Sequence, residues 1–140
     1  MKNWVFYSLI SMFFAGLTSV IAKLGLKNVS SDTGLAVRTV TVFVLVWLNA
    51  IAFQSVNDFK NLTKSDIIFL LISGVTTSLS WIFYYKAIKI GNVSQVALID
   101  KGSILITLLL SFVIFNEQFT WKVGLGASFI LIGLFILTIK

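Results

Sequence analysis

Long apolar segments without charge alternate along this chain with short polar segments. Residues 3–22, 39–57, 67–85 and 123–139 contain no Asp, Glu, Lys or Arg. A hydrocarbon core about 30 Å thick needs roughly 17–25 helical residues, so each segment can cross a membrane as one helix. The segments do not show the strict alternation that is typical of membrane barrel strands. The pattern predicts membrane-spanning helices.

A fifth apolar segment, residues 93–115, differs because it contains Asp100 and Lys101. An ionised residue deep in a span costs roughly 2.5–3.5 kcal/mol on insertion scales. The uncharged residues 102–116 nearly suffice to cross alone, which would leave the charged pair in the outer turns. We therefore predict a single helix here. The five expected spans cover residues 3–22, 38–56, 67–86, 93–115 and 122–139.

Short polar connections leave no room for a separate soluble domain. The pairs Ser31-Asp32 and Ser65-Asp66 are typical of helix N-caps and are expected to mark the starts of two helices. The sequence thus predicts an all-α integral membrane protein whose residues 1–140 form one domain.

The composition supports this prediction and removes several classes of function. Charged residues make up 11% of the chain, against about 25% in soluble domains. Cysteine and histidine are both absent, which removes thiol chemistry and the commonest general base and metal ligands. The net charge is +6, but the basic residues are scattered rather than clustered, so no nucleic-acid partner is expected. We predict that the protein is not an enzyme and binds neither a metal nor a cofactor. Its expected surroundings are the lipid bilayer.

Polar side chains follow one face of the fourth predicted helix. At 100° per residue, Asp100, Ser103 and Thr107 fall within about an 80° arc together with Ser111. Small hydroxyl residues are also ordinary packing residues in membranes, so the stripe alone has two explanations. A carboxylate inside a span needs a partner or water, which favours a functional site. Lys101 points about 100° away from Asp100, so the two need not pair.

Basic and aromatic residues complete the candidate pathway for a solute. Aromatic rings facing a cavity can bind organic cations or stack on planar molecules, whereas at the membrane interface they would only form a belt. Snorkelling to the headgroups is the alternative for Lys101, and the preferred explanation for Lys86 and Lys89 at the end of the third helix. The candidate pathway residues are Asp100, Lys101, Arg38, Lys86, Trp81, Tyr84, Ser103 and Thr107.

The last predicted helix has a different face. Gly126 and Gly133 lie seven residues apart and almost eclipse one another. Such a face lets another helix approach closely, although glycine is common in membrane helices generally. We expect this helix to form packing or dimer contacts.

Several short motifs occur in a fixed order: AKLGL at 22–26, WIFYYKA at 81–87, GNVS at 91–94, VALIDK at 96–101 and NEQFT at 116–120. In this order the chain resembles one repeat of EamA-type proteins in the drug/metabolite transporter superfamily, and most closely the five-helix bacterial and archaeal group. Family members often carry proline after the Val-Ala of helix four, where this chain has Leu98. A proline-broken fourth helix is therefore not expected.

The resemblance implies a secondary transporter of a small organic solute. Full-length members are similar to two inverted five-helix repeats, so a five-helix chain would act as an antiparallel homodimer or with a second half-size protein. A non-transporting partner subunit or a lipid-linked sugar flippase accessory is the alternative.

Membrane orientation follows from the basic residues. Lys2, Lys60, Lys64 and Lys122 would lie on one side, and the seven other basic residues on the other. That bias is small for the positive-inside rule. We therefore predict insertion into the cell membrane, an inner membrane, in both orientations.

Overall fold

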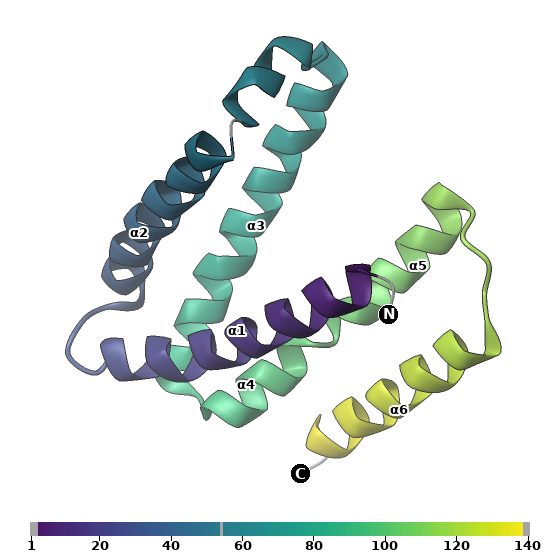
Figure 1. Ribbon diagram of the computed structural model, residues 1–140. Helices are drawn as coiled ribbons and strands as arrows, with labels where there is room; N and C mark the ends of the chain where they lie inside the picture. The colour runs from purple at the N-terminus through teal and green to yellow at the C-terminus, as the bar shows by residue number, and fades with distance from the viewer. Residues whose placement is uncertain (1–2, 54, 139–140) are drawn as a thin grey trace. The chain divides into compact units, whose positions relative to one another are not determined.

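The computed structural model describes residues 3–53 and 55–138, which form helices joined by short turns (Figure 1). Its elements are α1 (Asn3–Gly25), α2 (Ser31–Ala52), the 3₁₀ helix η1 (Ser55–Asn61), α3 (Lys64–Ile90), α4 (Val93–Asp100), α5 (Ser103–Phe115) and α6 (Trp121–Thr138). No strand occurs among the described residues. The all-α prediction is confirmed.

Helix length and hydropathy identify the membrane spans. Four segments are long and apolar enough to cross a membrane: Asn3–Gly25, Ser31–Ala52, Lys64–Ile90 and Val93–Phe115. The apolar part of the last helix, Trp121–Ile136, is shorter. Within the described residues only Leu26, Tyr85 and Ile88 are buried apolar side chains. Such wide apolar exposure suits a chain whose solvent is lipid, and this is a multi-pass membrane protein.

The two helix starts lie within one residue of the positions that the cap signals predicted, although the capping residues differ. The N-cap of α2 is Ser30, whose Oγ accepts a hydrogen bond of 3.1 Å from the Thr33 backbone N–H, so the helix begins at Ser31, seven residues before the expected membrane span at 38. At α3, Thr63 Oγ1 accepts from Asp66 N–H at 3.2 Å, and an Asp66 carboxylate oxygen accepts from Thr63 N–H at 3.0 Å. This reciprocal pair is a capping box that uses Thr63, not Ser65.

The predicted single helix at 93–115 is interrupted, which corrects the expectation from the missing proline. α4 ends at Asp100 and α5 begins at Ser103. Gly102 N–H donates to Ile99 O at 2.9 Å and Leu105 N–H donates to Gly102 O at 3.0 Å. Both bonds join residues three apart, so the helix tightens here into a 3₁₀-like turn. The interruption needs no proline, because backbone N–H donors make the hydrogen bonds of the tight turn.

The chain divides into two compact units, Met1–Ile90 and Gly91–Lys140. In the first unit α2 and α3 run antiparallel beside one another, and α1 contacts α3 (Figure 1). The ring of Trp47 on α2 stacks on Phe59 of η1, with ring centroids 5.8 Å apart and planes at 5°. The polar connection between α2 and α3 is thereby fixed against the helix that precedes it.

The second unit contains α4, α5 and α6, and α6 contacts α4. Asn116 adopts the left-handed conformation with φ of 51° and ends α5. The connection that follows places the ring of Phe119 edge-on to Phe112, with centroids 5.4 Å apart. A Cβ on Gly102 would lie 3.1 Å from Leu134 Cδ1. The glycine at the tight turn therefore lets α6 approach closely.

Candidate functional site

Arg38 forms the centre of an aromatic cluster in the first unit. Its guanidinium carbon lies 4.3 Å from the ring centroid of Trp81 and 5.7 Å from that of Tyr85. Trp81 and Tyr85 are four residues apart on α3, so helical geometry places both rings on one face. Cation–π contact of this kind stabilises a guanidinium by about 0.5–2 kcal/mol. Two rings of α3 thus hold the cation of α2.

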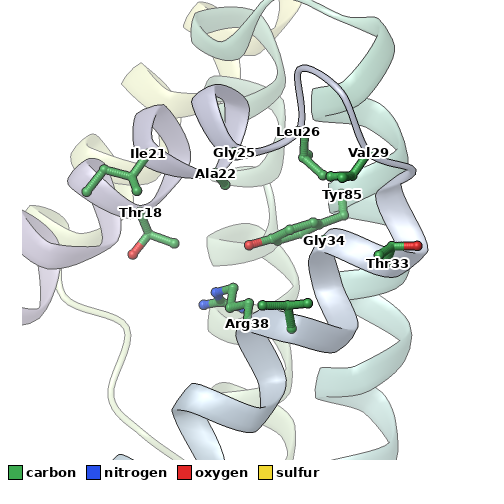
Figure 2. Close-up of a pocket in the computed structure, with 11 residues that line it drawn as sticks. Thr18, Ile21, Ala22, Gly25, Leu26, Val29, Thr33, Gly34, Arg38 and Tyr85 are labelled. Carbon is green, nitrogen blue, oxygen red and sulfur yellow. The ribbon is translucent and has the colours of Figure 1, made fainter.

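A cavity of about 480 Å³ lies beside this cluster (Figure 2). Its wall comes from α1, the α1–α2 connection, α2 and one residue of α3. The Tyr85 ring extends from α3 into the space between α1 and α2, next to the Arg38 guanidinium. The lining residues are Thr18, Ile21, Ala22, Gly25, Leu26, Val29, Thr33, Gly34, Val37, Arg38 and Tyr85.

Most of the cavity wall is apolar, and its polar groups are largely committed elsewhere. Arg38 is the only charged lining residue. Thr18 Oγ1 donates to Phe14 O at 2.9 Å within its own helix. Thr33 Oγ1 shares a hydrogen bond of 2.9 Å with Ser30 Oγ. The site therefore combines one cation with a hydrocarbon surface.

Gly34 shapes one end of this wall. A Cβ at this position would overlap Leu26 Cδ2, and Leu26 is 2% exposed. The absence of a side chain at Gly34 therefore lets the α1–α2 connection lie directly against α2. A larger residue would displace Leu26 from its buried position beside the cavity.

Polar contacts join the C-terminal ends of α1 and α3. Lys23 Nζ donates to Ile88 O at 2.6 Å and to Lys89 O at 3.1 Å. In return, Lys89 Nζ donates to Leu26 O and, at 3.2 Å, to Lys27 O. Each lysine satisfies carbonyls that the end of the other helix leaves without intrahelical partners. We call Lys23 and Lys89 the lysine clasp.

The ammonium group of Lys89, which was expected to reach the headgroups, has hydrogen-bond partners within the protein. This group binds backbone carbonyls of the same subunit because the last turn of α3 lies beside the end of α1. One turn earlier along each helix, Ser19 Oγ and the Tyr84 hydroxyl share a hydrogen bond of 2.6 Å. Tyr84 therefore joins α1 to α3, and its neighbour Tyr85 contacts the cavity.

Lys86, the remaining pathway candidate of the first unit, is exposed and lines a second cavity of about 830 Å³. Asp32 of α2 lines the same cavity. Arg38, Trp81, Tyr84 and Lys86 thus all lie along the α2–α3 pair, but they do not share one cavity.

The other four candidates belong to the second unit. The sequence did not require Asp100 and Lys101 to pair, but Asp100 Oδ2 lies 4.0 Å from Lys101 Nζ. The contact forms where the chain tightens at Lys101. Thr107 Oγ1 donates to Ser103 O at 3.1 Å. This bond lies within α5, so it leaves the Thr107 hydroxyl oxygen able to accept.

Sequence reasoning missed the contacts that build the first unit. Gly34, Ser19, Lys23 and Leu26 were not among the candidates. A signal existed for Lys23, since a basic residue in the last turn of a helix can bind the final carbonyls. Ser19 belongs to a stripe of small residues on α1, a pattern typical of helix packing in membranes. Nothing in the local sequence indicated which helix each residue meets.

Comparison with known proteins agrees with the helical architecture. Residues 2–139 match the EamA-like transporter family. A Sinorhizobium sp protein described as an uncharacterized transporter in the cobO 3′ region is 30% identical over 138 residues, which cover 99% of this chain and 98% of that protein. No solved structure matches the chain. The relative is thus nearly the same length as this chain.

Proposed function

Because the chain belongs to the EamA-like transporter family, we propose that it is a secondary transporter of a small organic solute. The observation that carries this proposal is the cavity of about 480 Å³ beside Arg38. Small-molecule sites typically enclose about 300–1,000 Å³ of mostly apolar wall with a few polar groups. The sequence contains no P-loop motif, so transport would use a solute or ion gradient.

We propose further that residues 1–140 act as one EamA-like domain within an antiparallel homodimer. Transporters built from inverted repeats bind their solute near the midplane, between the repeats. Two inverted copies of this chain would recreate that arrangement. Gly126 and Gly133 on α6 support a helix contact, since nothing lies within 4 Å of a Cβ built at either position. Their face has room for another helix.

The proposed solute pathway combines candidates from both units. Arg38 and Trp81 would bind the solute, and Tyr84 would hold α1 against α3. Asp100 would bind the solute or a coupling ion, since an intramembrane carboxylate is a functional group by default. Lys86, Lys101, Ser103 and Thr107 would line the remainder of the route. Transport, rather than catalysis, is the activity expected of a member of this family.

Orientation labelling tests the dimer. Single-cysteine variants at positions 2 and 140, which lie outside the described residues, can be made in this cysteine-free chain. The five spans that we propose would put the two termini on opposite membrane sides. In an antiparallel dimer each cysteine should react with an impermeant maleimide from both sides. Labelling from one side only would contradict the homodimer and favour a parallel dimer or a separate inverted partner.

Transport itself requires a second measurement. Thermal stabilisation of the purified protein across a panel of small metabolites identifies a solute, and uptake into proteoliposomes then tests transport with and without an imposed gradient. Adding lysines to the α2–α3 connection should force one orientation and reduce uptake. An oppositely biased copy, co-reconstituted, should restore it. Failure of every stabilising solute to be taken up by the unmodified protein would contradict the transport proposal.

A further inference from the structure

Arg38 is the only arginine in the chain, and the first unit supplies no counterion for it. Among residues 3–53 and 55–90, its guanidinium forms no ion pair and no hydrogen bond. Arg38 lies seven residues after the start of α2, which corresponds to about 10 Å along the helix axis. The cation therefore lies within a segment that is long and apolar enough to span a membrane.

The energetics of this position call for a counterion. A charged side chain within a span is costly and is almost always paired or faces a cavity. Contact with aromatic rings offsets part of that cost. An oxyanion bound to the guanidinium, with charge-assisted hydrogen bonds, can offset more of it.

The aromatic contacts of Arg38 are cation–π contacts, and among the described residues of the first unit none of its N–H donors forms a hydrogen bond. These N–H donors lie in the plane of the guanidinium group. Those donors form a planar fork that matches the two oxygens of a carboxylate. Trp81 and Tyr85 would thus hold the fork in position without using its hydrogen bonds.

The rest of the cavity defines the body of the ligand. Ile21, Ala22, Leu26, Val29 and Val37 present hydrocarbon to the space beside Arg38. No second cation lines the cavity, so a single negative charge is matched better than two. Hydrocarbon walls favour an apolar body, because its burial removes apolar surface from water.

We infer that this cavity binds a small organic monocarboxylate, with the carboxylate on Arg38 and an apolar body against α1 and the α1–α2 connection. The inference rests on the proposed transport function for its physiological meaning, because it names the class of solute carried. Binding itself can be measured without transport.

The test uses full-length protein in detergent and radiolabelled benzoate, a rigid carboxylate with an apolar ring. Unlabelled competitors distinguish the contribution of the charged head group from that of the apolar body. Benzamide is the neutral isostere, benzylamine is the cation and phenylphosphonate is the doubly charged anion. Acetate is the carboxylate without an apolar body. Benzoate should bind saturably. Each competitor should need at least about a tenfold higher concentration than unlabelled benzoate. Equal competition by benzamide would overturn the role of charge, and better competition by phenylphosphonate would replace monocarboxylate by phosphate chemistry.

Variants locate the site. Arg38→Gln should raise the Kd for benzoate at least about tenfold, because it removes the charged fork, and Arg38→Lys should retain part of the affinity. Ala22→Leu should also weaken binding, since it fills the cavity without changing charge. Lys60→Gln in η1 is the matched control for loss of one positive charge and should bind normally. Unchanged binding by Arg38→Gln would overturn the inference.

A variant that fails to fold does not remove the test, because the competitor series needs only the unmodified protein. The two proposals also fail separately. Benzoate bound through Arg38 but never taken up by proteoliposomes would count against transport and leave the binding site in place. Uptake of a cationic or neutral solute, with no benzoate binding, would overturn the monocarboxylate inference and leave transport in place.

Discussion

The contacts that stabilise the first unit differ in kind from those that stabilise the second. Between α1 and α3, the first unit uses the lysine clasp and the bond between Ser19 and Tyr84. The second unit uses aromatic and aliphatic contacts around glycines: Phe119 lies against Gly124, and Leu134 against Gly102. The ion pair that the structure describes in this unit is formed between the adjacent residues Asp100 and Lys101. It therefore does not connect one helix to a distant one.

The difference shows how a membrane subunit can fix one part and leave another adaptable. Hydrogen bonds to backbone carbonyls have a defined length and direction, so they set the position of the helix ends that border the cavity beside Arg38. Apolar surfaces in lipid gain little from one partner over another, because hydrocarbon surrounds them in either case. Helix ends that are fixed by hydrogen bonds therefore suit a cavity of defined shape. The glycine face of α6 suits contact with another helix.

The largest expected effect on subunit stability comes from the lysine clasp. Lys23→Met with Lys89→Met removes charge-assisted hydrogen bonds and leaves helix-end carbonyls unsatisfied. We expect the free energy of unfolding to fall by about 2–4 kcal/mol. SDS titration in mixed micelles, followed by loss of helical circular dichroism, measures the change. Lys60→Met with Lys64→Met provides the matched control, and equal midpoints for both pairs would show that the clasp does not stabilise the unit.

A smaller loss is expected from the tight turn of the second unit. In Gly102→Ala the new Cβ would lie 3.0 Å from Ile99 O and 3.1 Å from Leu134 Cδ1, so the Leu134 side chain and the turn must give way by a few tenths of an ångström. Overpacking of this kind costs about 1–2 kcal/mol. The same titration detects it, with Gly126→Ala as the control because nothing lies within 4 Å there. A stabilised Gly102→Ala protein would mean that the turn relaxes into regular helix.

Asp100→Asn should change stability by less than about 1 kcal/mol, because an exposed ion pair contributes little. Asp100 and Lys101 side chains are 39% and 58% exposed. Transport should nevertheless be lost, since the amide keeps the shape of the carboxylate and removes its charge. Unfolding and uptake are measured on the same preparation, with Asp58→Asn as the control. Uptake at the unmodified rate would reduce Asp100 to a packing residue.

The smallest change in subunit stability is expected on α6. Gly126→Leu with Gly133→Leu should leave unfolding within about 0.5 kcal/mol of the unmodified protein, as for a surface substitution. The dimer should dissociate, because bulky side chains prevent close approach of the backbones. Cross-linking in membranes reports the dimer, and SDS titration reports the subunit. A full dimer band from this variant would exclude this face of α6 from the interface.

The apolar runs predicted where most helices lie, because lipid imposes length and hydrophobicity directly on the sequence. The membrane span of α2 was expected only from position 38 because the charge-free run begins after Arg38, whereas the Ser31-Asp32 signal marked the start of the helix itself. Arg38 lies inside the helix, with its guanidinium against rings of α3. The interruption after Asp100 was also missed. It depends on a few backbone hydrogen bonds shifting from four to three residues apart, which leaves no mark on hydropathy.

Part of the candidate site was also visible in the sequence. Arg38 and Trp81 were identified because charge and aromatic rings are informative inside a span, and the structure brings them together. The neighbours Tyr84 and Tyr85 could not be separated by sequence alone. Residues one apart on a helix point about 100° apart, so Tyr84 meets Ser19 of α1 while Tyr85 faces Arg38 of α2.

The sequence by itself determined the class of the protein, its helical segments and the residues whose charge is costly in lipid. Each of these depends on the transfer of a residue from water to hydrocarbon, which is a property of the residue and its near neighbours. Only the tertiary structure decided that Lys23 and Lys89 bind each other's helix ends, and that Arg38 borders a cavity. The lysine contacts, and the contact of Arg38 with Trp81, join residues more than forty positions apart. Which residues meet is therefore decided by how the helices pack.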